Sequence, residues 1–363
     1  MAARRRARAR RRLDLPALSA MLALLLALAA ADTGSVAVRQ IAVAPAETLR
    51  VTLSGTGRPV VLVTGLIGSA YNYRQVVPAL HRHGLRTVVI EPLGVGYSSR
   101  PGKADYSYTA QGDRIGAVLD TLGLHRVPIV AHAGSASMVL RLAVRRPELV
   151  DRILLIQGIP DEVTATSAIK KAVKFRFLIK LFAGRGRIKK EVRQGFVEAS
   201  GDTTWITPEV IDSYTAGPAG DIGAVFRVLT GMTRAVEPDS ITNNLWRIQV
   251  PVRLLYGDAR AQGVPRSKPI ALMQQRLPHF QVDTVHGAGV HLHEERPDAV
   301  VASILDWLGE PTGAPHPASA DPGTGAAAPR PDSARPSAPA LIPLAGGRAA
   351  GPSRTAPARS ATR

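Results

Sequence analysis

Residues 130–156 read VAHAGSASMVLRLAVRRPELVDRILLI, and the order of side chains in this stretch decides the fold. It begins inside an apolar run at 127–132 that lacks polar alternation, as is typical of a strand buried on both faces of a parallel sheet. Small residues follow, then a helix-length segment over Ser135–Arg146, then a second apolar run at 152–158. The stretch predicts a strand–helix–strand unit with a sharp turn before the helix.

The same alternation continues in both directions along the chain. It predicts a doubly wound, mostly parallel eight-stranded sheet of class α/β with helices on both faces. Ile41–Ser54 supplies two leading antiparallel strands joined near Pro45. The remaining strands are expected at 59–65, 86–92, 252–258 and 279–285, and the remaining helices at Tyr71–His83, Thr109–Leu124 and Pro297–Leu308.

One long gap interrupts this rhythm. Between 158 and 252 no strong strand pattern occurs, and a segment of that length inside a compact domain needs structure of its own. We expect an inserted helical cap at about 160–248, with turns at Gly184, Pro208 and Pro218.

The net charge of +18 is concentrated in three segments. Residues 1–15 hold seven arginines and one aspartate, 169–193 hold ten Lys or Arg and one Glu, and 311–363 hold six arginines and two aspartates. The rest of the chain is almost neutral, so the basicity does not predict a nucleic-acid-binding fold. The absence of cysteine excludes a thiol nucleophile, a thiolate metal site and a disulfide framework.

The two ends are expected to lie outside the folded domain. A basic segment, an uncharged apolar stretch at 17–31 and the small residues Ala29–Ala31 have the order of a secretory signal peptide. Residues 1–31 are therefore expected to act as an export signal, or as an uncleaved N-terminal anchor. An organelle transit peptide is a third interpretation. The Pro/Ala/Arg-rich segment 311–363 is expected to be disordered, which leaves one domain at about 38–310.

Five ordered motifs resemble the capped α/β-hydrolase family, the group that contains epoxide hydrolases, haloalkane dehalogenases and cofactor-free haloperoxidases. The similarity runs from about Ile41 to Leu308. VVLVTGLIGSAYNYRQVVPAL (60–80) resembles the family's oxyanion turn, and EPLGVGYSSRP (91–101) resembles its D-x-x-G-x-G-x-S-x-x-P loop, with Glu91 in place of Asp. VAHAGSASMVLRLAVRRPELVDRILLI (130–156) resembles the nucleophile elbow. PVRLLYGDAR (251–260) resembles the strand before the acid, and GAGVHLHEERP (287–297) resembles the histidine loop.

The resemblance places unreactive residues at all three triad positions. The nucleophile position is Ala133, and Pro147 follows it by fourteen residues, as a proline commonly does in the family. The acid position is Arg260, and the histidine position is Val290, seven residues before Pro297. A methyl group cannot attack, a cation disfavours an imidazolium, and valine cannot move a proton. The oxyanion turn persists in part, with backbone N–H groups expected to converge near Thr64, Gly65, Leu66 and Gly134.

Two functional interpretations follow from these positions. In the first, the protein is a non-catalytic homologue that binds a small hydrophobic ligand or a partner through a cap-covered pocket. In the second, it is an active hydrolase of small hydrophobic esters or epoxides that uses a displaced triad of Ser135, His291 and Asp258, with Asp161 or Glu162 as alternative acids. A third interpretation is cofactor-free, non-hydrolytic chemistry at one loop histidine.

No cofactor or metal is expected from the sequence. His291 and His293 form only a weak pair without a clear third ligand, and the G-x-G at 94–96 lacks the later glycine of a dinucleotide site. The basic segment 169–193 interleaves Phe with Lys and Arg. A solvated outer cap surface accounts for it, and contact with an anionic membrane surface is the functional alternative.

Overall fold

The computed structural model describes residues 36–174, 185–261 and 267–310. Its eight strands form one sheet with the order β1-β2-β4-β3-β5-β6-β7-β8. β1 and β2 are antiparallel to their neighbours, and all pairs from β4 to β8 are parallel. The predicted fold class is thereby confirmed. The predicted export signal or anchor at 1–31 and the predicted disordered segment 311–363 lie outside the described residues.

The strands lie close to their predicted positions. They are β1 (Ala37–Ala44), β2 (Glu47–Ser54), β3 (Arg58–Val63), β4 (Leu85–Ile90), β5 (Val127–His132), β6 (Val150–Ile156), β7 (Val252–Gly257) and β8 (Phe280–Val285). β1 and β2 meet at a turn over Pro45 and Ala46, as expected. All six residues of β5 are buried, which explains why this strand is apolar without alternation.

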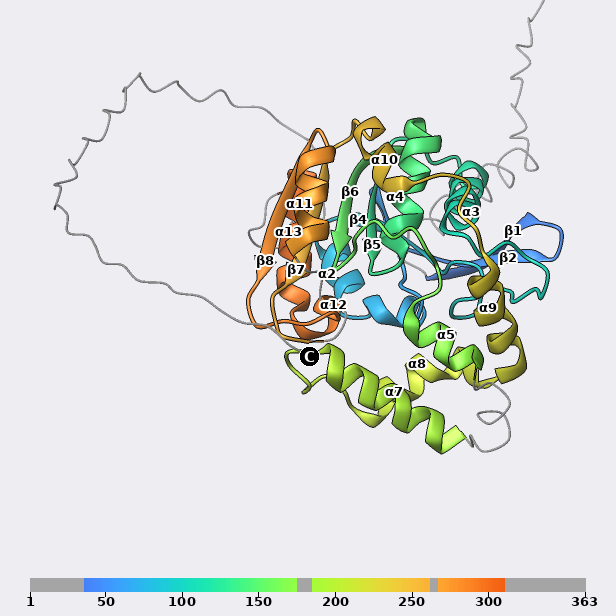
Figure 1. Ribbon diagram of the computed structural model, residues 1–363. Helices are drawn as coiled ribbons and strands as arrows, with labels where there is room; N and C mark the ends of the chain where they lie inside the picture. The colour runs from blue at the N-terminus through green and yellow to red at the C-terminus, as the bar shows by residue number, and fades with distance from the viewer. Residues whose placement is uncertain (1–35, 175–184, 262–266, 311–363) are drawn as a thin grey trace, which may run out of the picture. The chain divides into compact units, whose positions relative to one another are not determined.

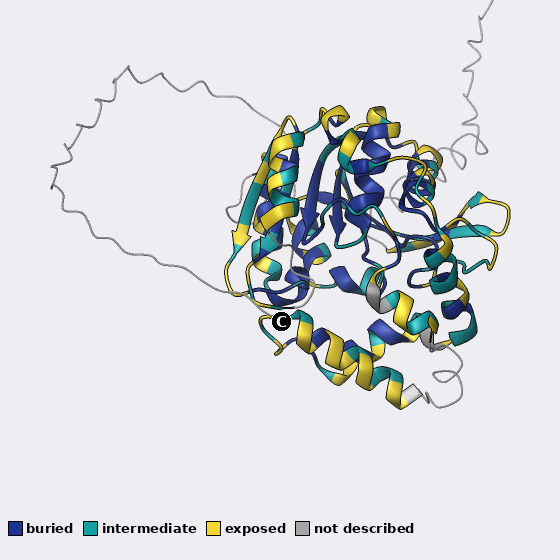
Figure 2. Cartoon of the chain, in the orientation of Figure 1, coloured by how far each residue is buried: buried dark blue, intermediate teal, exposed yellow. Residues whose placement is uncertain are grey.

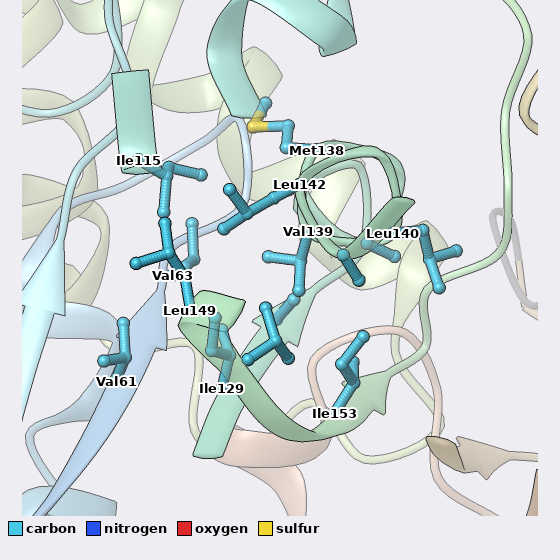
Figure 3. Close-up of a cluster of buried hydrophobic side chains, with 14 of the residues drawn as sticks. Val61, Val63, Ile115, Ile129, Met138, Val139, Leu140, Leu142, Leu149 and Ile153 are labelled. Atoms are coloured by element: carbon cyan, nitrogen blue, oxygen red, sulfur yellow. The ribbon is translucent and has the colours of Figure 1, made fainter. Parts of the chain in front are cut away.

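Alternate side chains of the strands pack into two separate cores, one on each face of the sheet, because successive residues of a strand point to opposite faces. α3 (Tyr108–Thr121), α4 (Ser135–Arg145) and α11 (Ser267–Arg276) contribute to one core with Val61, Val63 and Ile129. α2 (Val76–Arg82), α12 (Leu292–Glu295) and α13 (Pro297–Leu308) contribute to the other with Val60 and Leu62. Figure 3 shows α4 packed on the first core through Met138, Val139 and Leu142. This packing fixes the turn between β5 and α4.

The helices differ from the prediction at three places. The helix expected at Tyr71–His83 is divided into η1 (Ala70–Tyr73) and α2. Pro218 lies in the last turn of α8 (Pro208–Ala219) and does not form a separate turn, whereas Pro208 begins that helix after the Thr207 cap. α11 was not predicted. Gly184 lies outside the described residues.

The cap helices gather at the carboxyl end of the parallel strands (Figure 1). They are α5 (Ser167–Lys174), α7 (Arg185–Ala199), α8 and α9 (Ile222–Arg234). The chain then passes to the opposite end of the strands, where α10 (Ile241–Asn244) and η3 (Leu245–Arg247) lead into β7 (Figure 1). Figure 2 shows that α7 is largely exposed, whereas the central strands of the sheet and α4 are buried. No helix within the described residues is long and apolar enough to span a membrane.

One buried arginine joins the two ends of the cap to the sheet. Arg141 of α4 has a 2% exposed side chain and forms ion pairs with Glu162, Glu237 and Asp239. Glu237 also accepts hydrogen bonds from the backbone N–H groups of Tyr108 and Thr109 at 2.6 and 3.1 Å. The start and the end of the insertion therefore meet at a single side chain.

Candidate functional site

The turn between β5 and α4 keeps the backbone shape of a nucleophile elbow around Ala133. Ala133 has a φ of 49°, a left-handed conformation that costs a non-glycine residue about 1–2 kcal/mol. Its N–H donates to the carbonyl oxygen of Ile156 at 2.9 Å, which holds the turn against β6. A Cβ at Gly158 would come within 2.4 Å of Ala136 Cβ, so the neighbouring backbone requires a glycine. The elbow is formed, and a methyl group occupies its tip.

Ser135 lies at the start of α4 and is fully buried. Its Oγ accepts a hydrogen bond from the His132 N–H at 2.9 Å and donates toward the carbonyl oxygen of His132 at 2.8 Å. The carbonyl oxygen of Val63 lies 3.3 Å away on the same side. These contacts occupy the hydroxyl with the backbone beneath the elbow.

The end of β7 carries Asp258 and Arg260, and both are exposed. The Asp258 carboxylate lies 2.7 Å from Nδ1 of the exposed His286 and accepts the Gly287 N–H at 2.7 Å. These hydrogen bonds lower the pKa of Asp258, with the His286 side chain as the largest cause. The nearest histidine partner of Asp258 is therefore His286, which sequence reasoning did not consider.

Val290 acts through its backbone. Its N–H donates to the carbonyl oxygen of Ala199 in the cap at 2.8 Å, and its carbonyl oxygen lies 3.1 Å from His132 Nε2. Among the described residues, no hydrogen bond joins any two of Ser135, His291 and Asp258. The displaced triad thus has none of the mutual contacts that a nucleophile and its base require.

Three buried histidines converge where the elbow meets the histidine loop. The ring centroids of His132 and His293 are 4.4 Å apart, and His291 lies 5.8 Å from His132 and 6.1 Å from His293. Burial is the main cause that lowers the pKa of His132 to about 4 and of His291 to about 3, and it also lowers that of His293. All three imidazoles are therefore neutral at neutral pH. His132 is not among the predicted site residues because it lies far from the loop pair along the chain.

Two glutamates after the loop tie it to the cap. Glu294 accepts a hydrogen bond from the Tyr214 hydroxyl at 2.6 Å and pairs with Arg74. Glu295 accepts the N–H groups of Gly201 and Asp202, both at 2.9 Å, and that of Gly289. Phe196 and Trp205 of the cap pack against His291 at 4.8 and 5.2 Å between ring centroids. The cap therefore rests directly on the loop.

The Leu66 side chain lies beside Gly134 at the turn between β5 and α4. A Cβ on Gly134 would meet Leu66 Cδ1 at 3.2 Å, so the Leu66 side chain covers the notch. Gly65 faces His132 in the same way, because a Cβ there would lie 2.7 Å from its Nδ1. Thr64 is buried, and its hydroxyl has no partner among the described residues.

The alternative acids lie at the entrance to the cap and have structural contacts. Glu162 accepts hydrogen bonds from the N–H groups of Ile241 and Thr242 and from the Ser240 hydroxyl, and it pairs with Arg141. The Asp161 N–H donates to Ser137 Oγ at 2.7 Å, and burial raises the pKa of its carboxyl group. Glu162 thus caps α10.

A pocket of about 640 Å³ opens away from the elbow, between residues 102–106 and α9. Tyr106 and Phe226 are its buried apolar lining. Lys103, Arg227 and Arg234 are exposed around it. This recess, between the cap helix α9 and residues 102–106, offers an accessible place for a ligand.

Comparison with known proteins identifies the family. The profile of the alpha/beta hydrolase fold matches residues 58–181. RutD of Caulobacter sp. (strain K31), which carries the provisional name of a carbamate hydrolase, is 32% identical over 254 residues, or 69% of this chain and 90% of that protein. The chain belongs to the α/β-hydrolase fold family.

Two further matches have lower sequence identity. The uncharacterized hydrolase YugF of Bacillus subtilis (strain 168) is 23% identical over 254 residues, or 68% of this chain and 89% of YugF. The bromoperoxidase structure from Bacillus anthracis superposes with a TM-score of 0.62 at 21% identity, and the match covers 76% of this chain and all of that one. At this identity the structural likeness shows the fold alone.

Proposed function

We propose that this α/β-hydrolase-family protein is a non-catalytic homologue that binds a ligand without nucleophilic hydrolysis. The observation that carries the proposal is Ala133, which stands at the tip of a formed elbow with φ 49°. The strained backbone presents a side chain to the site, but a methyl group has no lone pair to attack a carbonyl or an epoxide carbon. Arg260 and Val290 at the other two positions agree with this proposal.

The rival function is hydrolysis by the displaced triad. The contacts of the candidate nucleophile and the candidate acid argue against this function. The Ser135 hydroxyl is hydrogen-bonded to the backbone of His132, and the Asp258 carboxylate is hydrogen-bonded to His286. A serine nucleophile needs a base within hydrogen-bond reach and an open path to the substrate. Ser135, with no exposed surface, has neither.

A serine-directed fluorophosphonate probe separates the two functions. The full chain is expected to remain unlabelled and to show no burst on short acyl esters. Labelling that disappears in Ser135→Ala would reject the proposal in favour of the displaced triad. Labelling that persists in Ser135→Ala would point to a contaminant or to a different serine, and peptide mapping would locate it.

Rebuilding the triad gives a second test. Ala133→Ser alone is expected to gain little, because it supplies no base and no orienting carboxylate. The combination of Ala133→Ser, Arg260→Asp and Val290→His is expected to label more strongly, since triad members act as a unit. Equal labelling of the single and triple variants would show that a base other than position 290 already serves the elbow.

The ligand site supported by the surface is the pocket beside α9. Its apolar lining from Tyr106 and Phe226 suits a small hydrophobic ligand. The described lining residues also include three cations, Lys103, Arg234 and Arg227, of which Arg227 pairs with Asp221, and one carboxylate, Asp105. That carboxylate is already engaged by Ser107. We therefore assign the pocket to small amphipathic ligands with an anionic group.

A matched series of decanoate, decanol and decylamine tests this assignment, because the three share one chain and differ in charge. Decanoate is expected to bind best, and added salt is expected to weaken it. Arg234→Gln should reduce decanoate affinity about two- to fivefold, which corresponds to one exposed ion pair. Arg247→Gln, an exposed arginine outside this pocket, is the control. Equal binding of all three ligands would contradict an anionic specificity.

A further inference from the structure

Three histidines from two distant parts of the chain share one buried space. His132 ends β5, whereas His291 and His293 belong to the histidine loop and α12. Their exposed fractions are 4%, 8% and 0%. One ring nitrogen from each lies within 4.8 Å of one from each of the others. Such a convergence of imidazoles, without a carboxylate among them, is the donor set of a transition-metal site.

The hydrogen bonds fix two of the tautomers. His132 Nε2 faces the carbonyl oxygen of Val290, which can only accept, so Nε2 carries the proton. His293 Nε2 lies 3.4 Å from the Tyr214 hydroxyl oxygen, whose own proton goes to Glu294. Nε2 of His293 is therefore also a donor. In both rings the lone pair is left on Nδ1.

These lone pairs have no partner. Nδ1 of His132, His291 and His293 is buried and accepts no hydrogen bond from any described residue. A buried polar atom without a partner costs about 1–3 kcal/mol, and here three such atoms occur in one cluster. The opposite ring nitrogens of His132 and His293 meet a backbone carbonyl and a tyrosine–glutamate pair. Metal-binding histidines have outer hydrogen bonds of this kind.

We propose that His132, His291 and His293 form a three-histidine site for a divalent transition-metal ion of the zinc class. Zinc holds its nitrogens at about 2.0–2.1 Å, and therefore about 3.3 Å from one another. From separations of up to 4.8 Å, the rings need to approach by no more than about 1.5 Å. Three protein ligands leave one tetrahedral position for water or a small anion. This site goes beyond the proposed binding function and does not depend on it.

An ion at this point would join the elbow strand to the loop that contacts the cap. His132 is in β5, while His291 packs on Phe196 and Trp205 of the cap. The site would thus stabilise the closed arrangement of strand, loop and cap by binding the folded state alone.

The test is metal titration of the full chain after chelator treatment and dialysis. Zinc is expected to bind one ion per chain and to raise the midpoint of thermal unfolding. Cobalt is expected to give the visible spectrum of a tetrahedral site. The chain has no cysteine, so this spectrum reports nitrogen and oxygen ligands only. His132→Gln, His291→Asn and His293→Gln should each lower zinc affinity by more than about 100-fold, since loss of an outer hydrogen bond alone costs 10–100-fold.

His125→Gln and His279→Gln, which change exposed histidines, are the matched controls and should bind zinc as the native chain does. Imidazole ¹⁵N spectra of the native chain make the test independent of variant folding, because zinc should shift the ring-nitrogen resonances of His132, His291 and His293. Absence of stoichiometric binding by the folded native chain would overturn the proposal. It would also be overturned if zinc bound with equal affinity in all three ligand variants, or shifted other histidines only.

Discussion

The Ser135 hydroxyl accepts a hydrogen bond from the backbone N–H of His132 at 2.9 Å, three residues earlier in the chain. The serine that sequence alone offers as a substitute nucleophile thus serves to hold the elbow closed. Its oxygen satisfies the last amide of β5, at the point where the strand ladder stops. The turn therefore depends on a side chain for its hydrogen bonding.

Ser135→Ala is expected to lower the free energy of unfolding by about 1–3 kcal/mol, because it leaves the buried His132 N–H without an acceptor. Urea denaturation measures this loss. Ser303→Ala is the matched control: Ser303 is also buried, but its hydroxyl has no partner among the described residues. That variant should be neutral or slightly stabilising, and equal losses in both would contradict the assigned role of Ser135.

Ala133→Gly is expected to leave stability unchanged or to raise it by up to about 1 kcal/mol. Glycine adopts a φ of 49° without the Cβ penalty, which offsets its greater freedom in the unfolded chain. Ala131→Gly, two residues earlier within β5, has no such strain to relieve and should lose about 1 kcal/mol or more. Thermal unfolding of the Ala133→Gly and Ala131→Gly variants shows whether each substitution raises or lowers the stability. A larger loss at 133 than at 131 would show that the elbow is not strained.

Arg141→Met is expected to destabilise the protein by about 3–5 kcal/mol, because it leaves the buried Glu237 carboxylate, whose side chain is 6% exposed, without its cation. Arg145→Met, one turn further along α4, breaks an exposed pair with Asp113 and should cost less than about 1 kcal/mol. Chemical denaturation of both variants makes the comparison. Similar effects would mean that the Arg141 pairs contribute no more than surface pairs do.

Glu295→Gln is expected to loosen the cap without unfolding the sheet. The carboxylate accepts three backbone N–H groups, two of them in the cap, and an amide oxygen is a weaker acceptor than a charged one. Limited proteolysis should cut faster near 199–202 in this variant. Glu148→Gln, an exposed site at the far end of α4, should keep the native cleavage rate. Unchanged cleavage in Glu295→Gln would place the cap restraint elsewhere.

The sheet was predictable because each strand carries its own signal. β5 occupies the predicted residues because all six of them are buried, and buried strand positions favour the apolar residues that predicted it. α11 was missed because its few buried positions, such as Met273, leave little apolar pattern in ten residues. The predicted helix is divided at Arg74 because its first residues form a 3₁₀ turn capped by Ser69. Composition does not predict the change in chain direction at this turn.

The contacts within the site were not predictable from the sequence. The assignment of Ala133, Arg260 and Val290 to the triad positions rests on the resemblance to the family's motifs and stays a prediction. The pairing of Asp258 with His286, and the meeting of His132 with His291 and His293, depend on how β5, β7 and the last loop approach one another in space. One feature of the sequence pointed to this meeting. His132 lies at the carboxyl end of a parallel strand, which is also the end that the histidine loop must reach.

The attachment of both cap ends to Arg141 also bears on how this chain tolerates change. An insertion whose two ends are held at one point behaves as a closed loop, and its closure entropy grows only with the logarithm of its length. Doubling the number of residues between Glu162 and Asp239 would cost about 0.6 kcal/mol in closure. The α4 arginine therefore lets the segment between them change in length at little entropic cost, provided that its contacts with the histidine loop are kept.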